Sequence, residues 1–189
     1  MKVGRVIARP FDGEPGNFKR TANRRDFSIE PPEETVLDKI KNAGYDTIAI
    51  GKITDIFASQ GITKSIFTHS NREGMESMSE ILKTDFNGLC FVNLVDFDMV
   101  YGHRRDKDGY AEALSEFDEF LTEFIEGMNE DDLLIITADH GCDPCFKGTD
   151  HTRESVPIIV YGKNKKPENL ETIKGFSYVS EIILKYLCI

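Results

Sequence analysis

The sequence reads LCFVNLVDFD from residue 89 to residue 98, a nearly continuous apolar run that ends in two acids. A strand that is apolar along its whole length, rather than alternating, is expected to be covered on both faces, as in a parallel sheet between helices. Ligands of such sheets collect at the carboxyl ends of the strands. This stretch therefore predicts the fold class and the place to look for a functional site.

Helix-then-strand units recur on both sides of this run. Apolar residues at helical spacing predict helices over residues 36–44, 71–82, 110–124 and 179–187. Apolar or β-branched runs predict strands over residues 2–8, 46–50, 133–137 and 156–161. This alternation predicts an α/β fold, with a mostly parallel sheet sandwiched by helices.

Two segments near the amino terminus are expected to be irregular. Residues 10–17 are rich in turn residues and predict a long polar loop. Residues 21–32 show little periodicity and close with Pro31 and Pro32, so they are the best candidate for a linker. The boundary is placed near residue 30, dividing the chain into residues 1–30 and residues 31–189.

Composition excludes several classes of function. The chain has 189 residues, 40% of them hydrophobic and 30% charged, which is typical of a folded globular domain. A formal net charge of -10 argues against a nucleic-acid partner, because phosphate backbones require clustered cations. With no membrane-length apolar run and no signal-peptide pattern, a cytoplasmic protein is expected. Four scattered cysteines predict free thiols in a reducing compartment.

Polar clusters follow two of the predicted strands. They read DFDMVYGHRR at residues 96–105 and TADHG at residues 137–141, with GTDHTR following at residues 148–153. Three of the four histidines of the chain lie in these stretches. Carboxylates and imidazoles together suit Mn²⁺, Zn²⁺ or iron, whereas Mg²⁺ or Ca²⁺ alone favours oxygen ligands. The clusters therefore predict a metal site.

The same stretches resemble the metal-binding signatures of phosphopentomutases, which belong to the alkaline phosphatase superfamily. The order and spacing of the three clusters match, as do the opening GRVIARPF at residues 4–11 and AIGKI at residues 49–53. The DHG run and the later histidine are typical of the whole superfamily. The GHRR run and the opening segment favour the pentomutase branch.

This resemblance implies two Mn²⁺ ions, held by residues from separate clusters. Asp98, His103 and His151 would hold one ion, and Asp139 and His140 would contribute to the second. Two bound cations can clamp a transferring phosphoryl group and neutralise its oxygens. Arg5 and Lys52 resemble the residues that grip the distal phosphate and the sugar, a task that permanent positive charge suits.

The reaction implied is the interconversion of ribose 1-phosphate and ribose 5-phosphate, or of the deoxyribose pair, through a phosphothreonine and a sugar bisphosphate activator. In the family, this threonine and a first Asp ligand of the second metal lie in an amino-terminal half, expected before Met1. Residues 1–30 would then end an inserted cap domain, and residues 31–189 would form the second part of the core. By itself such a chain is expected to be inactive.

Alternative functions remain open within and outside the superfamily. A cofactor-independent phosphoglycerate mutase or a phosphatase would use the same metal signatures. A non-catalytic module that binds metal or phosphate is the alternative from another class. The basic opening segment and Lys52 favour a sugar-phosphate enzyme.

Two further features have less specific interpretations. Cys142 and Cys145 form a CxxC in a loop, which by itself fits neither a helix-opening redox pair nor a complete zinc site, although oxidation there could affect metal loading. Arg104, Arg105 and Arg153 flank the proposed ligands and could orient carboxylates or contact phosphate.

Overall fold

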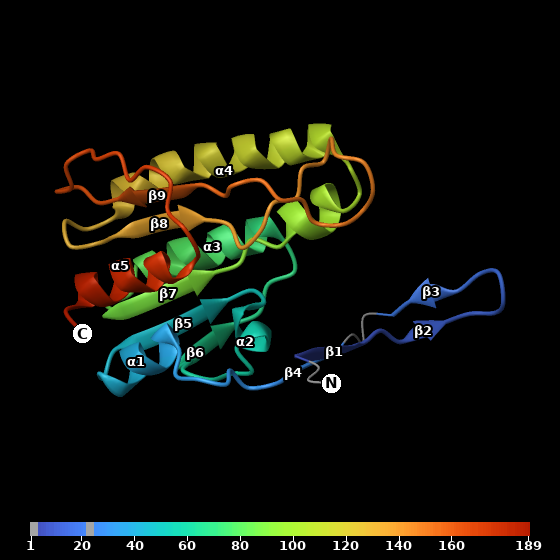
Figure 1. Ribbon diagram of the computed structural model, residues 1–189, viewed down its shortest axis with the longest axis horizontal. Helices are drawn as coiled ribbons and strands as arrows, with labels where there is room; N and C mark the ends of the chain where they lie inside the picture. Colours follow the sequence, from blue (N-terminus) through green and yellow to red (C-terminus); the bar gives the residue numbers. More distant parts are fainter. Residues whose placement is uncertain (1–3, 22–24) are drawn as a thin grey trace.

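The computed structural model describes residues 4–21 and 25–189, and its centre is a three-stranded parallel sheet (Figure 1). The strand order is β6 (Lys64–Ile66), β5 (Asp46–Ile50) and β7 (Gly88–Val92). The middle strand is buried from its second residue onward, and Ile48 and Ile50 join Ile81 in the hydrophobic core. The predicted strand at residues 46–50 is confirmed, and the strand predicted at residues 89–95 is confirmed over a shorter length.

Helix α1 (Val36–Asn42) begins at a capping box formed by Thr35 and Asp38. The Thr35 side chain accepts a hydrogen bond from the backbone of Asp38, while the Asp38 carboxylate accepts one from the Thr35 backbone at 2.8 Å. This exchange satisfies two backbone donors that the helix start leaves unpaired. Leu37 and Ile40, both buried, form the apolar face that the sequence predicted.

The longer helices match the predicted periodic segments. They are α3 (Asn71–Leu82), α4 (Lys107–Gly127) and α5 (Ser177–Leu187). Helix α3 packs against β5 and β7, α4 lies against α3, and α1 contacts α5. Strand β6 and the short helix α2 (Ile53–Ile56) were not predicted, because neither is long enough to show a periodic pattern.

The prediction of a mostly parallel sheet holds only for the three central strands. Strands β8 (Leu134–Thr137) and β9 (Ile158–Tyr161) pair antiparallel with each other in a separate two-stranded sheet. Strand β9 is also not covered on both faces, since Ile159 is 53% exposed. An apolar run predicts that a strand forms. Whether that strand pairs parallel or antiparallel depends on a partner strand that is distant in sequence.

The amino-terminal region is more regular than predicted. Strand β1 (Arg5–Ala8) pairs antiparallel with β4 (Arg25–Ser28), which lies inside the predicted linker. The expected polar loop instead contains β2 (Phe11–Asp12), which pairs with β3 (Lys19–Arg20) in a hairpin that projects away from the rest of the molecule (Figure 1). The first residues of the strand predicted from Lys2 lie outside the described part of the chain.

The carboxyl ends of β5 and β7 lie at one edge of the parallel sheet. Ile50 is opposite Val92, and the Asn93 backbone donates to the Ile50 carbonyl at 3.0 Å. Gly51 has a φ of +80°, and a Cβ there would lie 2.6 Å from the Asn93 carbonyl oxygen, so a side chain would clash. The segments that follow β5 and β7 therefore begin side by side.

No helix within residues 4–21 and 25–189 combines the length and the apolar character that crossing a lipid bilayer requires.

Candidate metal centre

The first polar cluster folds into a π-helical turn, η1 (Phe97–Gly102), which follows β7 after a four-residue loop. The His103 backbone donates to the Asp98 carbonyl at 3.0 Å, which closes a five-residue turn. Such wide turns are rare and often occur at functional sites. Here the turn brings Asp98 Oδ1 within 3.2 Å of His103 Nε2.

The second and third clusters meet through an antiparallel bridge between Gly141 and Thr152. The Thr152 backbone donates to the Gly141 carbonyl at 3.0 Å, which brings the segments that carry His140 and His151 together. Their rings are stacked, with centroids 3.5 Å apart and planes inclined by 14°. Thr152 is buried, and its hydroxyl accepts a hydrogen bond from the Asp143 backbone at 2.7 Å, which braces this loop.

Asp98, His103 and His151 form a nearly equilateral triangle of ligand atoms. Asp98 Oδ1 lies 3.2 Å from His103 Nε2 and 3.3 Å from His151 Nε2, and the two Nε2 atoms are 3.2 Å apart. Two ligand atoms each about 2.1 Å from one ion lie about 3.0–3.4 Å apart when the angle between them is roughly 90–110°. The triangle therefore has the dimensions of three ligands around one ion.

The hydrogen bond of His103 also suits a cation. His103 Nδ1 lies 2.5 Å from the Thr149 carbonyl oxygen, which accepts only if Nδ1 carries the proton. Nε2 of His103 then presents a lone pair to Asp98 Oδ1, an atom that is buried and makes no hydrogen bond. A divalent cation among these atoms would bind both the His103 lone pair and the Asp98 oxygen.

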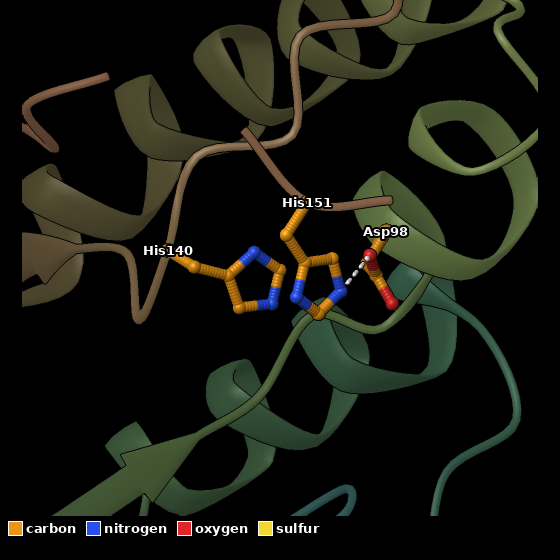
Figure 2. A group of neighbouring side chains, drawn as sticks. All are labelled: Asp98, His140 and His151. Atoms are coloured by element: carbon orange, nitrogen blue, oxygen red, sulfur yellow. Dashed lines mark ion pairs between the residues drawn. The ribbon is translucent and has the colours of Figure 1, made fainter. Parts of the chain in front are cut away.

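His140 lies next to the triangle, whereas Asp139 points toward solvent. Figure 2 shows the His151 ring between His140 and the Asp98 carboxylate, and the ligand atoms of these three residues lie within 4.8 Å of one another. His140 Nδ1 is 3.0 Å from the Gly141 carbonyl oxygen, which again favours a lone pair on Nε2. The Asp139 side chain is 76% exposed, with Oδ2 3.6 Å from His140 Nε2.

Arg105 ties the first cluster to the third through backbone carbonyls. Its guanidinium donates to the carbonyl oxygens of Asp143 at 2.8 Å, Asp150 at 2.7 Å and Gly102 at 3.2 Å, and also to that of Gly148. Arg105 itself has a φ of +57°, which is uncommon for a residue with a side chain. Of the roles left open by the sequence, the structure supports a positioning one for this arginine.

Cys142 is a further potential ligand that sequence reasoning did not include. Its Sγ and ligand atoms of Asp98 and His103 all lie within 4.8 Å of one another. Burial raises the pKa of the Cys142 thiol, and the Asp98 carboxylate raises it further. The signal that could have identified it was its place two residues after His140, inside the same strand-end loop.

The two cations expected to bind substrate occupy different places. Lys52 follows β5 at the carboxyl edge, and its ammonium donates to the thioether of Met99, the residue after Asp98. It therefore lies beside η1. Arg5 is exposed at the start of β1, in the small sheet next to α2.

Comparison with known proteins agrees with these features. The family model of the metalloenzyme superfamily matches residues 7–189. A phosphopentomutase from Lachnoclostridium phytofermentans is 57% identical over 185 residues, which cover 97% of this chain and 47% of the relative. The chain thus spans about half the length of this curated relative.

Proposed function

The chain belongs to the metalloenzyme superfamily, and on this basis we propose that it carries the two-metal site of a phosphopentomutase. The observation that carries the proposal is the triangle of Asp98 Oδ1, His103 Nε2 and His151 Nε2, with sides of 3.2 to 3.3 Å. Its mixture of one carboxylate oxygen and two imidazole nitrogens suits Mn²⁺.

The proposal assigns the predicted ligands to two ions. Asp98, His103 and His151 hold the first Mn²⁺, while His140 and Asp139 contribute to the second. Support for the second set is the 3.6 Å separation of Asp139 Oδ2 from His140 Nε2 and the contact of His140 with the triangle. Bound cations at these places supply charge neutralisation for the oxygens of a transferring phosphoryl group. The carbonyl of Thr149 keeps the proton of His103 on Nδ1, so Nε2 stays available.

A pentose phosphate is the proposed substrate class. Lys52, beside η1, is suited to hold a phosphate or sugar oxygen near the metal site, and Arg5 to hold the distal phosphate. We assign residues 1–30, including the projecting hairpin (Figure 1), to the end of a cap domain, and residues 31–189 to a metal-binding core resembling that of alkaline phosphatase. The reaction is the interconversion of ribose or deoxyribose 1-phosphate and 5-phosphate, with a sugar bisphosphate as activator.

A chimera provides the test of this function. Because the match covers 47% of the Lachnoclostridium phytofermentans relative, the remainder of that protein can be combined with this chain. We assign the phosphorylated threonine to that remainder, and expect Mn²⁺-dependent conversion of ribose 1-phosphate by the chimera and none by the chain alone. Replacing His103 with Ala should abolish conversion, whereas replacing the exposed His69, outside the cluster, should not.

The alternatives give different results in the same assay. A phosphoglycerate mutase would act on 3-phosphoglycerate and not on ribose 1-phosphate, and a phosphatase would release inorganic phosphate. A folded chimera that binds metal and turns over none of these substrates would support a non-catalytic binding module. Any of these outcomes would overturn the pentomutase assignment.

A further inference from the structure

Cys142 places a thiol beside two corners of the proposed metal triangle, Asp98 and His103, in a position that the assignment above does not use. Its Sγ lies within 4.8 Å of ligand atoms of both Asp98 and His103. Close packing against Gly102 limits where the thiol can lie, since a Cβ at Gly102 would be 2.6 Å from Sγ and 2.8 Å from the Phe97 carbonyl oxygen. A side chain at position 102 would therefore collide with the thiol, and glycine leaves room for the thiol beside η1.

A second observation points to a ligand at the same place. Asp98 belongs both to the triangle and to the group that contains Cys142, and its Oδ1 is buried and makes no hydrogen bond. An unsatisfied buried carboxylate oxygen is costly unless a cation or a donor reaches it. Carboxylate, imidazole and thiol around one point form a donor set that suits zinc better than manganese, because thiolate is a soft ligand.

We propose that Cys142 is the fourth ligand of a closed, four-coordinate site for a thiophilic divalent cation of the zinc class, formed with Asp98, His103 and His151. This inference rests on the proposed metal triangle and adds metal discrimination to it. When such a cation binds, the thiol proton passes to solvent and a sulfur lone pair forms the fourth bond. Mn²⁺, which favours oxygen and imidazole ligands, would bind the triangle without the sulfur and leave one coordination position open.

The functional consequence is selective inhibition by soft metals. A tetrahedral site with four protein ligands has no open position, which is typical of structural rather than catalytic zinc. A phosphoryl oxygen could then not reach the cation. Zinc is thus expected to bind the chain more tightly than manganese and to hold the centre in an unproductive form.

Cobalt is a spectroscopic probe for this fourth ligand in the full chain. With Co²⁺ bound, the unmodified chain should show visible ligand-field bands and, in the near ultraviolet, a thiolate-to-cobalt charge-transfer band. Cys142→Ser should keep the ligand-field bands and lose the charge-transfer band. The matched control is Cys145→Ser, which removes an exposed thiol from the same loop and should keep both. Cys90 packs against the hydrophobic core, where burial raises the pKa of its thiol to about 12.

One measurement covers the case in which Cys142→Ser does not fold, and a second applies when it does. X-ray absorption by the zinc-loaded, unmodified chain should reveal a sulfur neighbour at about 2.3 Å from the metal. For a folded variant, the ratio of Zn²⁺ affinity to Mn²⁺ affinity should fall roughly tenfold or more, as expected when a metal site loses a partner.

The outcomes separate this inference from the function it rests on. Bound cobalt without a thiolate band, together with zinc lacking a sulfur neighbour, would overturn the role of Cys142 and leave the metal triangle intact. A chain that binds neither Co²⁺ nor Zn²⁺ in equilibrium dialysis would overturn both.

Discussion

The Arg105 guanidinium donates to the backbone carbonyl of Asp150 at 2.7 Å, joining the end of η1 to the residue that precedes His151. The same side chain also reaches the carbonyls of Asp143 and Gly148. One planar cation thus holds together the segments that supply the proposed ligands. Lysine, a point charge, cannot present several fixed donors in this way.

Arg105→Lys is therefore expected to weaken Mn²⁺ binding by about 10–100-fold, the usual cost of losing a group that orients metal ligands. Isothermal titration of the full chain measures this loss. The neighbouring Arg104 is exposed, so Arg104→Lys is the matched control and should bind normally. Equal affinity in both variants and the unmodified chain would show that Arg105 does not position the ligands.

Removing a proposed metal ligand should weaken Mn²⁺ binding more than removing a residue that only supports the ligands. His103→Ala deletes one corner of the triangle, and the Kd for Mn²⁺ should rise by more than about 100-fold, beyond the range for supporting groups. Asp139→Ala should have a smaller effect on the first ion, because that side chain is 76% exposed and lies outside the triangle. A larger effect of Asp139→Ala in the same titration would contradict the proposed division of ligands.

A reciprocal pair of hydrogen bonds joins α3 to the loop before η1. The Asn71 backbone donates to Asp96 Oδ2 at 2.7 Å, and the Asp96 backbone donates to Asn71 Oδ1 at 2.8 Å. Asn71 is buried, so Asn71→Ala leaves a backbone donor unsatisfied and should lower the free energy of unfolding by about 1–3 kcal/mol.

Urea denaturation with Asn42→Ala as control tests this prediction. Asn42 is exposed at the end of α1, where it donates to Glu34 Oε1 at 3.1 Å. Its loss should change stability by no more than about 0.5 kcal/mol, as is usual for surface substitutions. Similar losses from the two variants would argue against a special role for the buried pair.

The capping box of α1 should make stability depend on pH. Hydrogen bonds from the Thr35 side chain and backbone lower the pKa of Asp38 below its ordinary 3.8. The associated stability is present above pH 3.8 and is lost as pH falls through the folded-state pKa. Asp38→Asn should therefore destabilise the chain at neutral pH and have a diminishing effect in acid.

Thr35→Ala removes the cap oxygen itself and should cost about 1 kcal/mol at neutral pH. Thermal and urea unfolding of both variants across the acid range measure these effects. A stability difference between Asp38→Asn and the unmodified chain that stays constant down to full protonation of the carboxyl would rule out the linkage.

The sequence by itself determined where most regular elements lie and which polar clusters are candidates for a metal site. Apolar spacing at Leu37 and Ile40 identified a helix, and residues 46–50 identified the central strand, because local burial leaves a periodic record along the chain. Residue types in the polar clusters predicted a metal site, and the family resemblance implied Asp98 and His103 as ligands. These sequence patterns depend only on residues that are close to one another along the chain.

Tertiary structure alone decided which strands pair and which groups each side chain contacts. Nothing in the local sequence of β8 or β9 specifies that these strands pair antiparallel with each other, in a sheet separate from the parallel one. In the same way, the exposure of Asp139, the approach of Cys142 to Asp98 and the reach of Arg105 to Asp150 follow from contacts between segments distant in sequence. The physical reason is that residue type sets what a group can bind, whereas packing of the whole chain sets which group it meets.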